Sequence, residues 1–516
     1  MDTLDSAMAL AIRERLGARD LARSNAVCRP FNVLGNDEHL WRRLLSLETH
    51  ALVGPNELPE GVESRAKRLF VYNRAWVTGN CRRDALETRY DTRFVETAFG
   101  SALPENKNTT QQWSLRGVSR GGVVIDRCDT PTATEIDALA EVDTFFENMH
   151  FERKHKYDSY ESFKEGRFAT SATFINADDA NVAISGFADG RLRASGADAF
   201  KSYAKSRRWI TGKKNPYPAL VYPLDFEADG KIAKLAALDS ETELDSDAAR
   251  IVVAAVDTKN RKRAHPGAGR ERGVLLTMRV PSFLPNYEEH DDGEGMFGVT
   301  LPAIRGGWFV THDEITALRS GGESTTAGVF FAGTASGMVE KYDLGNGQPR
   351  VVNSFVGQCA CHVADVGRVF DNQIVATYQH HTRGTGHANG CLVFDTRHSG
   401  NRVAVVELPK CFVCYTGIDS NGDSSYEAPC ALHVDTNKVI LAQADGHTHV
   451  FDRRTWTEVS SFHLRGNEEG KIIKVNSFCT RGARIAAQVV RENKNATHWN
   501  ALEPMVDTLV TGTVGG

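Results

Sequence analysis

The chain lacks the segments and motifs by which membrane proteins, secreted proteins and many enzymes are recognised. No stretch approaches the roughly 18 apolar residues of a membrane span, and the first residues contain no apolar run typical of a secretion signal. The sequence also lacks a phosphate-binding glycine loop and the catalytic motifs G-x-S-x-G and H-E-x-x-H. It has no His/Cys pair or carboxylate pair at the spacing found in enzyme families. We therefore expect a soluble, non-catalytic protein, cytoplasmic or nuclear or both, with no cofactor and no membrane contact.

The sequence also lacks a regular cysteine spacing and a strong net charge of one sign. Ten cysteines are scattered without a regular framework, which favours free thiols in a reducing compartment. The 516 residues carry a formal net charge of −5, which argues against a dedicated nucleic-acid binder. With 41% apolar and 25% charged residues, the composition is that of a folded protein with more than one core, or with a large repeat-built domain and a small one.

The first part of the chain has the spacing of short helices. Residues 1–75 lack strand alternation, and apolar residues recur every fourth position up to Leu16. A second helical stretch covers 20–28, and Pro30 ends it because proline has no N–H for the next hydrogen bond. Asn36 is a suitable N-cap for a third helix.

A further, basic helix over 62–76 connects this region to the rest of the chain. Three helices of about a dozen residues cannot bury much core alone, so the rest of the chain or a partner must cover their apolar side chains. The pattern alone leaves a helical cap on the large domain and a docking module equally open.

Three short motifs give this region a family likeness. They are Asp20-Leu21, Val27-Cys28-Arg29 followed by Phe31, and Leu40-Trp41-Arg42-Arg43-Leu44. In this order and spacing they resemble the F-box, with Leu4-Asp5 standing where that family has Leu-Pro. The resemblance implies binding to the Skp-type adaptor of cullin–RING ubiquitin ligases. The adaptor-binding residues that it implies are Leu16, Leu21, Val27, Cys28, Phe31, Leu40, Trp41 and Leu44.

From Trp76 onward the period of the pattern changes to two, as in strands. Three segments, 184–192, 331–339 and 441–448, share one order: a strand, small residues, an Asp-Gly or Ser-Gly turn and a second strand. Second strands end in an aromatic residue and aspartate, at Tyr342-Asp343, Phe394-Asp395 and Phe451-Asp452. About seven hairpin turns recur along the chain, which indicates a repeat architecture.

This repetition resembles a WD-repeat β-propeller, with the aromatic–Asp pairs where that family has Trp-Asp. A pair of strand-rich sandwiches is the structural alternative. An α/β enzyme is disfavoured because the region has no room for regular crossover helices. Leu509 to Thr513 predict one more strand, which either closes a propeller against its first strand or belongs to a truncated blade.

Together the two resemblances imply a small all-α N-terminal F-box followed by an all-β WD-repeat-like β-propeller of about seven blades. The expected domains are the F-box at 1–50, a linker helix and junction at 51–80, and the propeller at 81–516. The implied function is that of a substrate-recognition adaptor of an SCF-type (Skp–cullin–F-box) E3 ubiquitin ligase, whose propeller binds a target protein, phosphorylated or not. A propeller scaffold outside any ligase is the main alternative, and a propeller enzyme is a more distant one.

Two clusters have the residue types of metal ligands. His380, His381 and His387 form the densest histidine cluster, and Cys411 and Cys414 have CxxC spacing. Adjacent residues of a strand face opposite sides, so His380 and His381 could not both bind a metal unless they lie in a loop. A strand over 411–415 would place Cys411 and Cys414 on opposite faces. We therefore interpret the histidines as part of an inter-strand loop and the cysteines as buried structural residues, and we expect no metal site.

Runs of charge are interpreted as solvated loops. Basic clusters lie at 205–214 and 259–263, and acidic runs at 241–247 and 288–294. The second basic cluster has a nuclear-import signal or a phosphate-reading rim as its functional alternatives.

Overall fold

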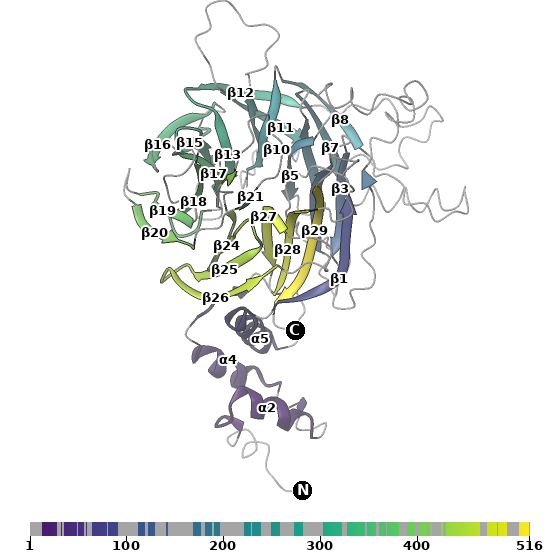
Figure 1. Ribbon diagram of the computed structural model, residues 1–516, viewed down its shortest axis with the longest axis vertical. Helices are drawn as coiled ribbons and strands as arrows, with labels where there is room; N and C mark the ends of the chain where they lie inside the picture. Colours follow the sequence, from purple (N-terminus) through teal and green to yellow (C-terminus); the bar gives the residue numbers. More distant parts are fainter. Residues whose placement is uncertain are drawn as a thin grey trace, which may run out of the picture.

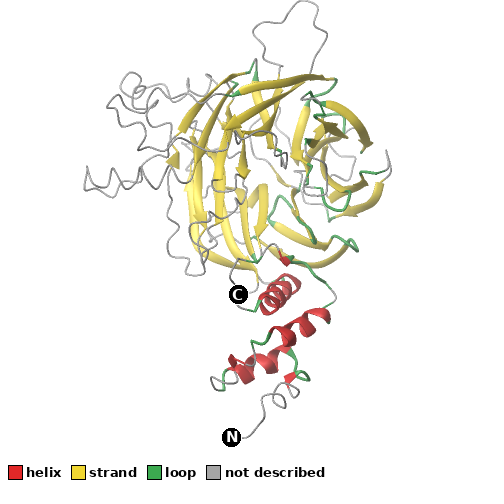
Figure 2. Cartoon of the chain, turned by 180° about the vertical axis from the view of Figure 1, so that it is seen from behind, coloured by secondary structure: helices red, strands yellow, loops and turns green. Residues whose placement is uncertain are grey.

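The structure, a computed structural model, describes most of the helical segment and the strands of the body. The described residues are 13–27, 32–33, 36–48, 50–55, 58, 64–79, 81–90, 112–118, 122–128, 141–142, 169–176, 181–187, 190–196, 221–228, 230–238, 249–257, 273–281, 303–321, 328–345, 348–357, 361–367, 369–380, 390–397, 402–409, 413–414, 425–426, 430–464, 472–481, 483–492 and 505–514. Helices lie at one end of the molecule, and sheets fill the rest (Figures 1 and 2). We call these two parts the head and the body. Within the described ranges, no helix is long and apolar enough to cross a membrane.

The head contains the helices α2 (Ala18–Asn25), α4 (Glu38–Ser46) and α5 (Arg65–Thr78). The N-cap of α4 is Asp37 and not Asn36 as predicted, because the Asp37 carboxylate accepts a hydrogen bond from the His39 N–H at 2.8 Å. Helix α5 ends at Gly79, whose φ of +65° is the left-handed conformation that glycine adopts without strain.

The body is all-β in its described residues, and its sheets are antiparallel. One three-stranded sheet contains β2 (Gln112–Val118), β3 (Gly122–Cys128) and β4 (Glu141–Val142). Two four-stranded sheets follow: β5 (Ala169–Asn176), β6 (Asn181–Phe187), β7 (Arg191–Gly196) and β8 (Val221–Glu227), then β9 (Lys231–Ala237), β10 (Ala249–Asp257), β11 (Gly273–Pro281) and β12 (Ile304–Thr311).

The next four-stranded sheet contains β13 (Ile315–Ser320), β14 (Val329–Thr334), β15 (Met338–Asp343) and β16 (Arg350–Val356). Another contains β17 (Cys361–Val366), β18 (Gln373–His380), β19 (Gly390–Asp395) and β20 (Arg402–Glu407). A two-stranded sheet of β21 (Val413–Cys414) and β22 (Ser425–Tyr426) precedes β23 (Ala431–Val434), β24 (Lys438–Ala442), β25 (His447–Asp452) and β26 (Thr457–His463). The remaining sheet has the order β1 (Cys81–Tyr90), β29 (Met505–Val514), β28 (Arg484–Glu492) and β27 (Ile472–Arg481).

The three similar sequence segments are confirmed as strand–turn–strand hairpins. Gly190, Gly337 and Gly446 stand at the turns with φ of +89°, +86° and +90°. Residues other than glycine are strained at such positive φ angles, so the turns need glycine. The aromatic–Asp pairs end β15, β19 and β25, as predicted.

One sheet joins segments from opposite ends of the body. The strand predicted from Leu509 is part of β29, which pairs with β28 on one side and with β1 on the other. Thr88 lies opposite Leu509, and Arg82 lies opposite Thr513. The β1 strand, which comes directly after the head, is therefore covered by a strand from the C-terminal part of the chain.

Consecutive sheets pack against each other in chain order. A strand at one end of each sheet contacts the corresponding strand of the next, from β5 through β9, β13 and β17 to β23 and β27. The apolar clusters between these sheets each draw residues from two neighbours, such as Phe355 of β16 and Phe394 of β19, whose ring centroids are 5.7 Å apart. The central strands β10, β14 and β24 are thus buried on both faces, which explains their nearly continuous apolar runs.

Candidate functional site

Four of the predicted adaptor-binding residues form the core of the head. Leu21, Leu40, Trp41 and Leu44 are buried against Ala66 and Phe70 of α5. The Trp41 and Phe70 rings are 5.5 Å apart, and the Lys67 ammonium lies 5.6 Å from the Trp41 ring. Because their side chains face each other, these four residues hold the head together in the chain as it stands alone.

The other predicted residues divide differently. Leu16 is half-buried at the edge of this core, and Val27 is 69% exposed. Cys28 and Phe31 lie outside the described residues. Val33 and Leu47, which the sequence interpretation did not name, are 69% and 67% exposed. The spacing of apolar residues in the sequence predicts helix faces. Only the packing of α5 decides which of these apolar residues are buried and which remain on the surface.

Polar contacts fix α4 relative to α5. Both carboxylate oxygens of Glu38 accept from the Ala66 N–H, at 3.1 and 3.2 Å, in the first turn of α5. The same carboxylate faces the Arg42 guanidinium at 3.4 Å, and Lys67 donates to the Asn36 side chain at 2.7 Å. A negative group at a helix N-terminus is stabilising, so the start of α5 is held by α4.

One side of α5 is packed into the body. Leu69, Ala75 and Trp76 belong to an apolar cluster that includes residues of the sheets β23–β26 and β27–β1. The Trp76 ring is fully buried with its centroid 6.3 Å from that of Phe462, and its carbonyl accepts from the Ser460 hydroxyl. A Cβ on Gly79 would meet the Ser461 carbonyl oxygen at 2.9 Å, so the chain leaves the helix in close contact with β26. We call the packing of Leu69, Ala75, Trp76 and Gly79 against the sheets β23–β26 and β27–β1 the joint.

The joint also contains a buried lysine. Lys438 is 0% exposed, its ammonium donates to the Leu52 carbonyl at 3.2 Å, and it lies 5.1 Å from the Trp76 ring. Asp435 forms an ion pair with it. A buried cation needs such partners, and here they come from both the head side and the body side.

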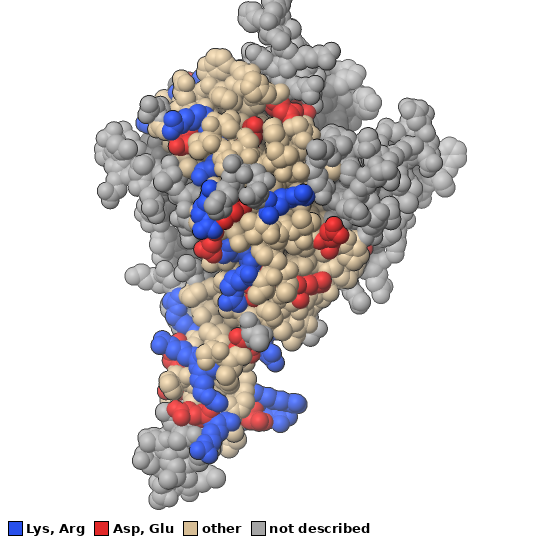
Figure 3. Space-filling model, turned by 90° about the vertical axis from the view of Figure 1, so that its left-hand side faces the viewer, with Lys and Arg blue, Asp and Glu red and all other residues tan. Residues whose placement is uncertain are grey.

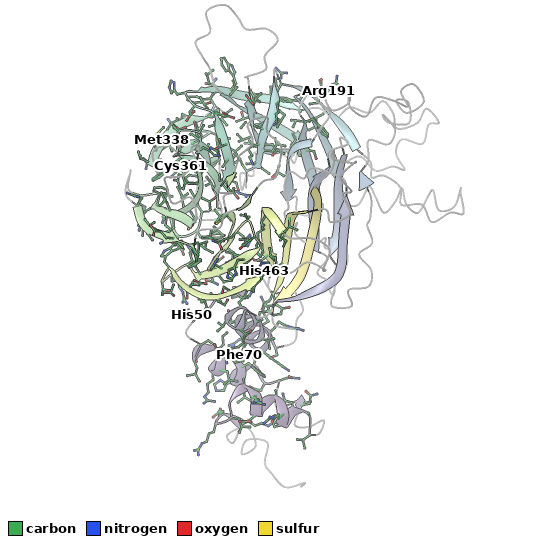
Figure 4. All side chains as sticks on the ribbon, viewed as in Figure 1. His50, Phe70, Arg191, Met338, Cys361 and His463 are labelled. Atoms are coloured by element: carbon green, nitrogen blue, oxygen red, sulfur yellow. The ribbon has the colours of Figure 1, made fainter. Side chains whose placement is uncertain are left out.

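A second charged group ties the head segment to β25. The buried Asp452 carboxylate accepts from His50 Nδ1 at 3.0 Å and from Arg454 at 3.1 Å. Burial on its own raises the pKa of Asp452, but the hydrogen bonds from Arg454 and His50 outweigh burial and lower that pKa. The joint is therefore held by apolar packing and by directional polar contacts. Figure 4 labels His50 where the head meets the body.

The body contains a histidine cluster that the sequence interpretation missed. The rings of His447 and His449 are 4.7 Å apart, and His463 lies opposite His447 across β25 and β26. His449 is engaged by Glu458 at 2.9 Å and by Gln443 at 3.4 Å. The spacing of His447 and His449, two residues apart in one strand, places them on the same face, but only strand pairing adds His463.

The predicted metal-type clusters fall largely outside the described residues. His381, His387 and Cys411 are not described, and for His380 and Cys414 only the strand position is. Within the described ranges no three His, Cys, Asp or Glu side chains converge on a metal position.

Three cysteines of the body, Cys361, Cys391 and Cys430, are buried free thiols. Burial raises the pKa of Cys391 far above its ordinary value. A thiol held in its neutral form in this way is a poor nucleophile, so it packs as a small apolar side chain. The charged runs 205–214, 259–263, 241–247 and 288–294 lie outside the described residues.

Comparison with known proteins identifies one region. The family model described as F-box-like matches residues 8–46, which include α2 and α4. F-box-like domains generally bind Skp-type adaptors. No WD-repeat family model matches the body. No curated protein matches the chain.

Proposed function

We propose that this chain is the substrate-recognition adaptor of an SCF-type E3 ubiquitin ligase. The head binds a Skp-type adaptor and, through it, a cullin–RING ligase, while the body binds the target protein. The F-box-like match at residues 8–46 is the observation that carries this proposal. The transfer of ubiquitin takes place on other subunits, so no residue of this chain needs to be catalytic.

The joint supports the proposal because it gives the head and the body a fixed relative orientation. Buried contacts at Trp76, Lys438 and Asp452 connect them. A target held on the body is then presented at a defined place relative to the ligase. Holding two reactants close together in this way raises their effective concentration.

The body is proposed to be a WD-repeat-like β-propeller of about seven blades. Three observations support this architecture: the four-stranded antiparallel sheets, their packing in chain order, and the pairing of β1 with β29. In closed repeat architectures, a strand from one end of the chain completes the sheet formed by the other end, which removes exposed edges.

The exposed apolar residues of the head determine how the proposal is tested. Leu21→Asp with Trp41→Ala would disrupt the core of the head, so a loss of adaptor binding would have two explanations. Val27→Asp with Val33→Asp changes only exposed side chains inside the matched region. Val71→Asp, on the exposed side of α5 outside that region, is the matched control.

The experiment is co-purification of the full chain with a Skp-type adaptor, followed by a titration of the two proteins. We expect a one-to-one complex that Val27→Asp/Val33→Asp weakens by about tenfold or more, while Val71→Asp leaves it unchanged. A wild-type chain that forms no complex would refute the ligase function and favour the alternative, a propeller scaffold that acts outside any ligase.

A further inference from the structure

The outer strand of one sheet carries apolar residues where an exposed edge usually carries charge. The large exposed apolar residues of the body, within its described ranges, lie on β12, β16 and β20. On β16 they are Val351, Val352 and Val356, and the only charged residue of that strand is Arg350. Exposed edges without charges tend to pair with other chains, so an apolar edge points to an interaction site.

The strand β26 provides a comparison within the same molecule. It is also the last strand of its sheet, and it carries Thr457, Glu458, Ser460 and Ser461 although α5 packs against it. Among the described residues, the edge that α5 contacts is therefore polar, and the edge formed by β16, with three exposed valines, is apolar. This is the reverse of what solubility alone would favour.

The pairing of β15 with β16 places three cross-strand pairs on one face. Met338 lies opposite Val356, Glu340 opposite Ser354, and Tyr342 opposite Val351. Tyr342 belongs to the apolar cluster shared with the sheet β9–β12, and its hydroxyl donates to the Glu340 carboxylate at 2.6 Å. Since side chains two residues apart share a face, Met338 and Glu340 lie on the same side as Tyr342.

This face forms a strip with a carboxylate in the middle and apolar groups at both ends. Val356 is 56% exposed and Val351 41% exposed, while Met338, Glu340 and Ser354 are half-buried. Phe309 of β12 borders the strip, with its ring centroid 5.8 Å from that of Tyr342. In Figure 4 the label of Met338 shows where the strip lies, at the outer side of the body. Figure 3 shows this side, where much of the surface is uncharged and the charged groups are separate.

Glu340 is the group that defines the ligand. Among the described residues it makes no ion pair; its hydrogen-bond partner is the Tyr342 hydroxyl. The nearby Arg350 already faces Asp343, at 3.6 Å. A half-buried carboxylate between apolar groups is best satisfied by a cation that arrives with apolar neighbours.

We propose that this strip binds an extended segment of a target protein with a lysine or arginine between two apolar residues, at positions i, i+2 and i+4. Neighbouring pairs on a strand face are about 7 Å apart, which is the spacing of alternate side chains in an extended peptide. The cation meets Glu340, and the apolar residues meet Val356 with Met338 on one side and Val351 on the other. This inference rests on the proposed function in that it makes the body the target-binding part.

The test uses a fluorescent nine-residue peptide with the centre Val-Thr-Lys-Thr-Val, titrated with the full chain. A second peptide has Glu in place of Lys. We expect the Lys peptide to bind and Glu340→Gln to weaken it about tenfold, because glutamine keeps the hydrogen bond from Tyr342 but removes the charge. Glu407→Gln, which removes an exposed carboxylate from the outer strand β20, is the matched control and should have no effect.

Further variants separate the apolar contribution from the charge. Val356→Ser should weaken the Lys peptide by about three- to tenfold, and Val405→Ser on β20 should not. Glu340→Lys should reverse the preference, so that the Glu peptide becomes the better ligand. Melting curves of each variant show whether the fold is retained.

Three results would overturn the proposal. The wild-type chain could bind neither peptide, or it could bind the Lys and Glu peptides equally well. It could also form a dimer that Val356→Lys dissociates, in which case a second copy covers the strip. Adaptor binding is measured separately, so a chain that binds the adaptor and not the peptide refutes this inference alone, and the converse refutes only the ligase function.

Discussion

The two apolar clusters that share α5 differ in size and in chemistry. Among the described residues, the cluster within the head contains six buried residues, with Ala66 and Phe70 from α5. The cluster at the joint contains eighteen, of which Leu69, Ala75 and Trp76 come from α5. One helix therefore completes a small core with one side and enters a large core with the other.

This difference shows how a small helical module is stabilised. In the part of the head that the structure describes, the buried core is completed by Ala66 and Phe70 of α5, so this core depends on a helix that the body holds in place. The joint adds the buried charges of Lys438 and Asp452, which require specific partners and so favour one orientation. The comparison predicts that damage to the head stays local, whereas damage to the joint affects both parts.

The largest expected effect is that of Trp76→Ala at the joint. Removing a fully buried indole should lower the free energy of unfolding by about 3–5 kcal/mol. It should also expose α5 and the segment before it to proteolysis, because Trp76 packs on Phe462 and its neighbours. Chemical denaturation and limited proteolysis of the full chain measure the two consequences.

Phe70→Ala is the counterpart on the head side of the same helix. It should abolish adaptor binding and leave the main unfolding transition of the body unchanged. If Phe70→Ala lowered the stability of the body as much as Trp76→Ala, the two clusters would be one cooperative unit and the comparison would fail.

The second prediction concerns the buried charge at the joint. Lys438→Met keeps an apolar chain next to Trp76 but leaves the Leu52 carbonyl and Asp435 without their cation. We expect a loss of roughly 2–3 kcal/mol in the free energy of unfolding. Lys341→Met, at a half-exposed site on β15, is the matched control and should change stability by no more than about 0.5 kcal/mol. Equal effects of the two substitutions would show that Lys438 has no structural role at the joint.

Much of the head could be predicted from its sequence, but not the division of its residues between core and surface. The spacing of Leu21, Trp41 and Leu44 indicates apolar helix faces, and the family match supports the module. Which face is buried depends on where α5 packs. Its position is set by the contacts of Glu38 with Ala66 and of Asn36 with Lys67, which join residues more than 25 positions apart in sequence. These contacts are set by tertiary packing, so local periodicity carries no information about them.

In the body, the hairpins and the all-β class could be predicted because glycine turns and alternation are local signals. The partners of each strand could not. For the strand from Leu509 the sequence left two alternatives open, a closing strand and a truncated blade, and the structure pairs β29 with β1. The strip around Glu340 depends on the register between β15 and β16, and a shift of one residue would move Glu340 to the other face. The number of blades and the domain limits 1–50, 51–80 and 81–516 stay predictions.

The third prediction uses pH to test the body separately from the head. Burial lowers the pKa of His433 to about 4, and this imidazole shares a hydrogen bond with Thr480 of β27 at 3.0 Å. In the unfolded chain its pKa is about 6.5, so below that pH the unfolded state binds a proton that the folded state does not. Stability should therefore fall as the pH drops from 6.5 toward 4, by about 1 kcal/mol at pH 5.5 relative to pH 7.

Denaturation curves between pH 7 and pH 5 measure this slope, and His433→Gln should reduce it. Adaptor binding by the head should follow a different pH profile, because His433 lies in the sheet β23–β26 and outside the head cluster. An unchanged slope in His433→Gln would assign the acid sensitivity to other groups.

The smallest expected effect concerns the contact by which α4 holds the start of α5. The Glu38 carboxylate accepts from the Ala66 N–H and also pairs with Arg42, so Glu38→Ala loses both contacts and Arg42→Ala only the exposed ion pair. We expect Glu38→Ala to cost the head about 0.5–1 kcal/mol and Arg42→Ala about 0.3–0.5 kcal/mol or less. Hydrogen exchange of the first-turn amides of α5 measures the difference, since protection at Ala66 should fall only in Glu38→Ala. The amides near Trp76 should keep their protection in both variants, because the body holds that end of the helix; a uniform loss along α5 would mean that the head cluster, and not the joint, fixes the helix.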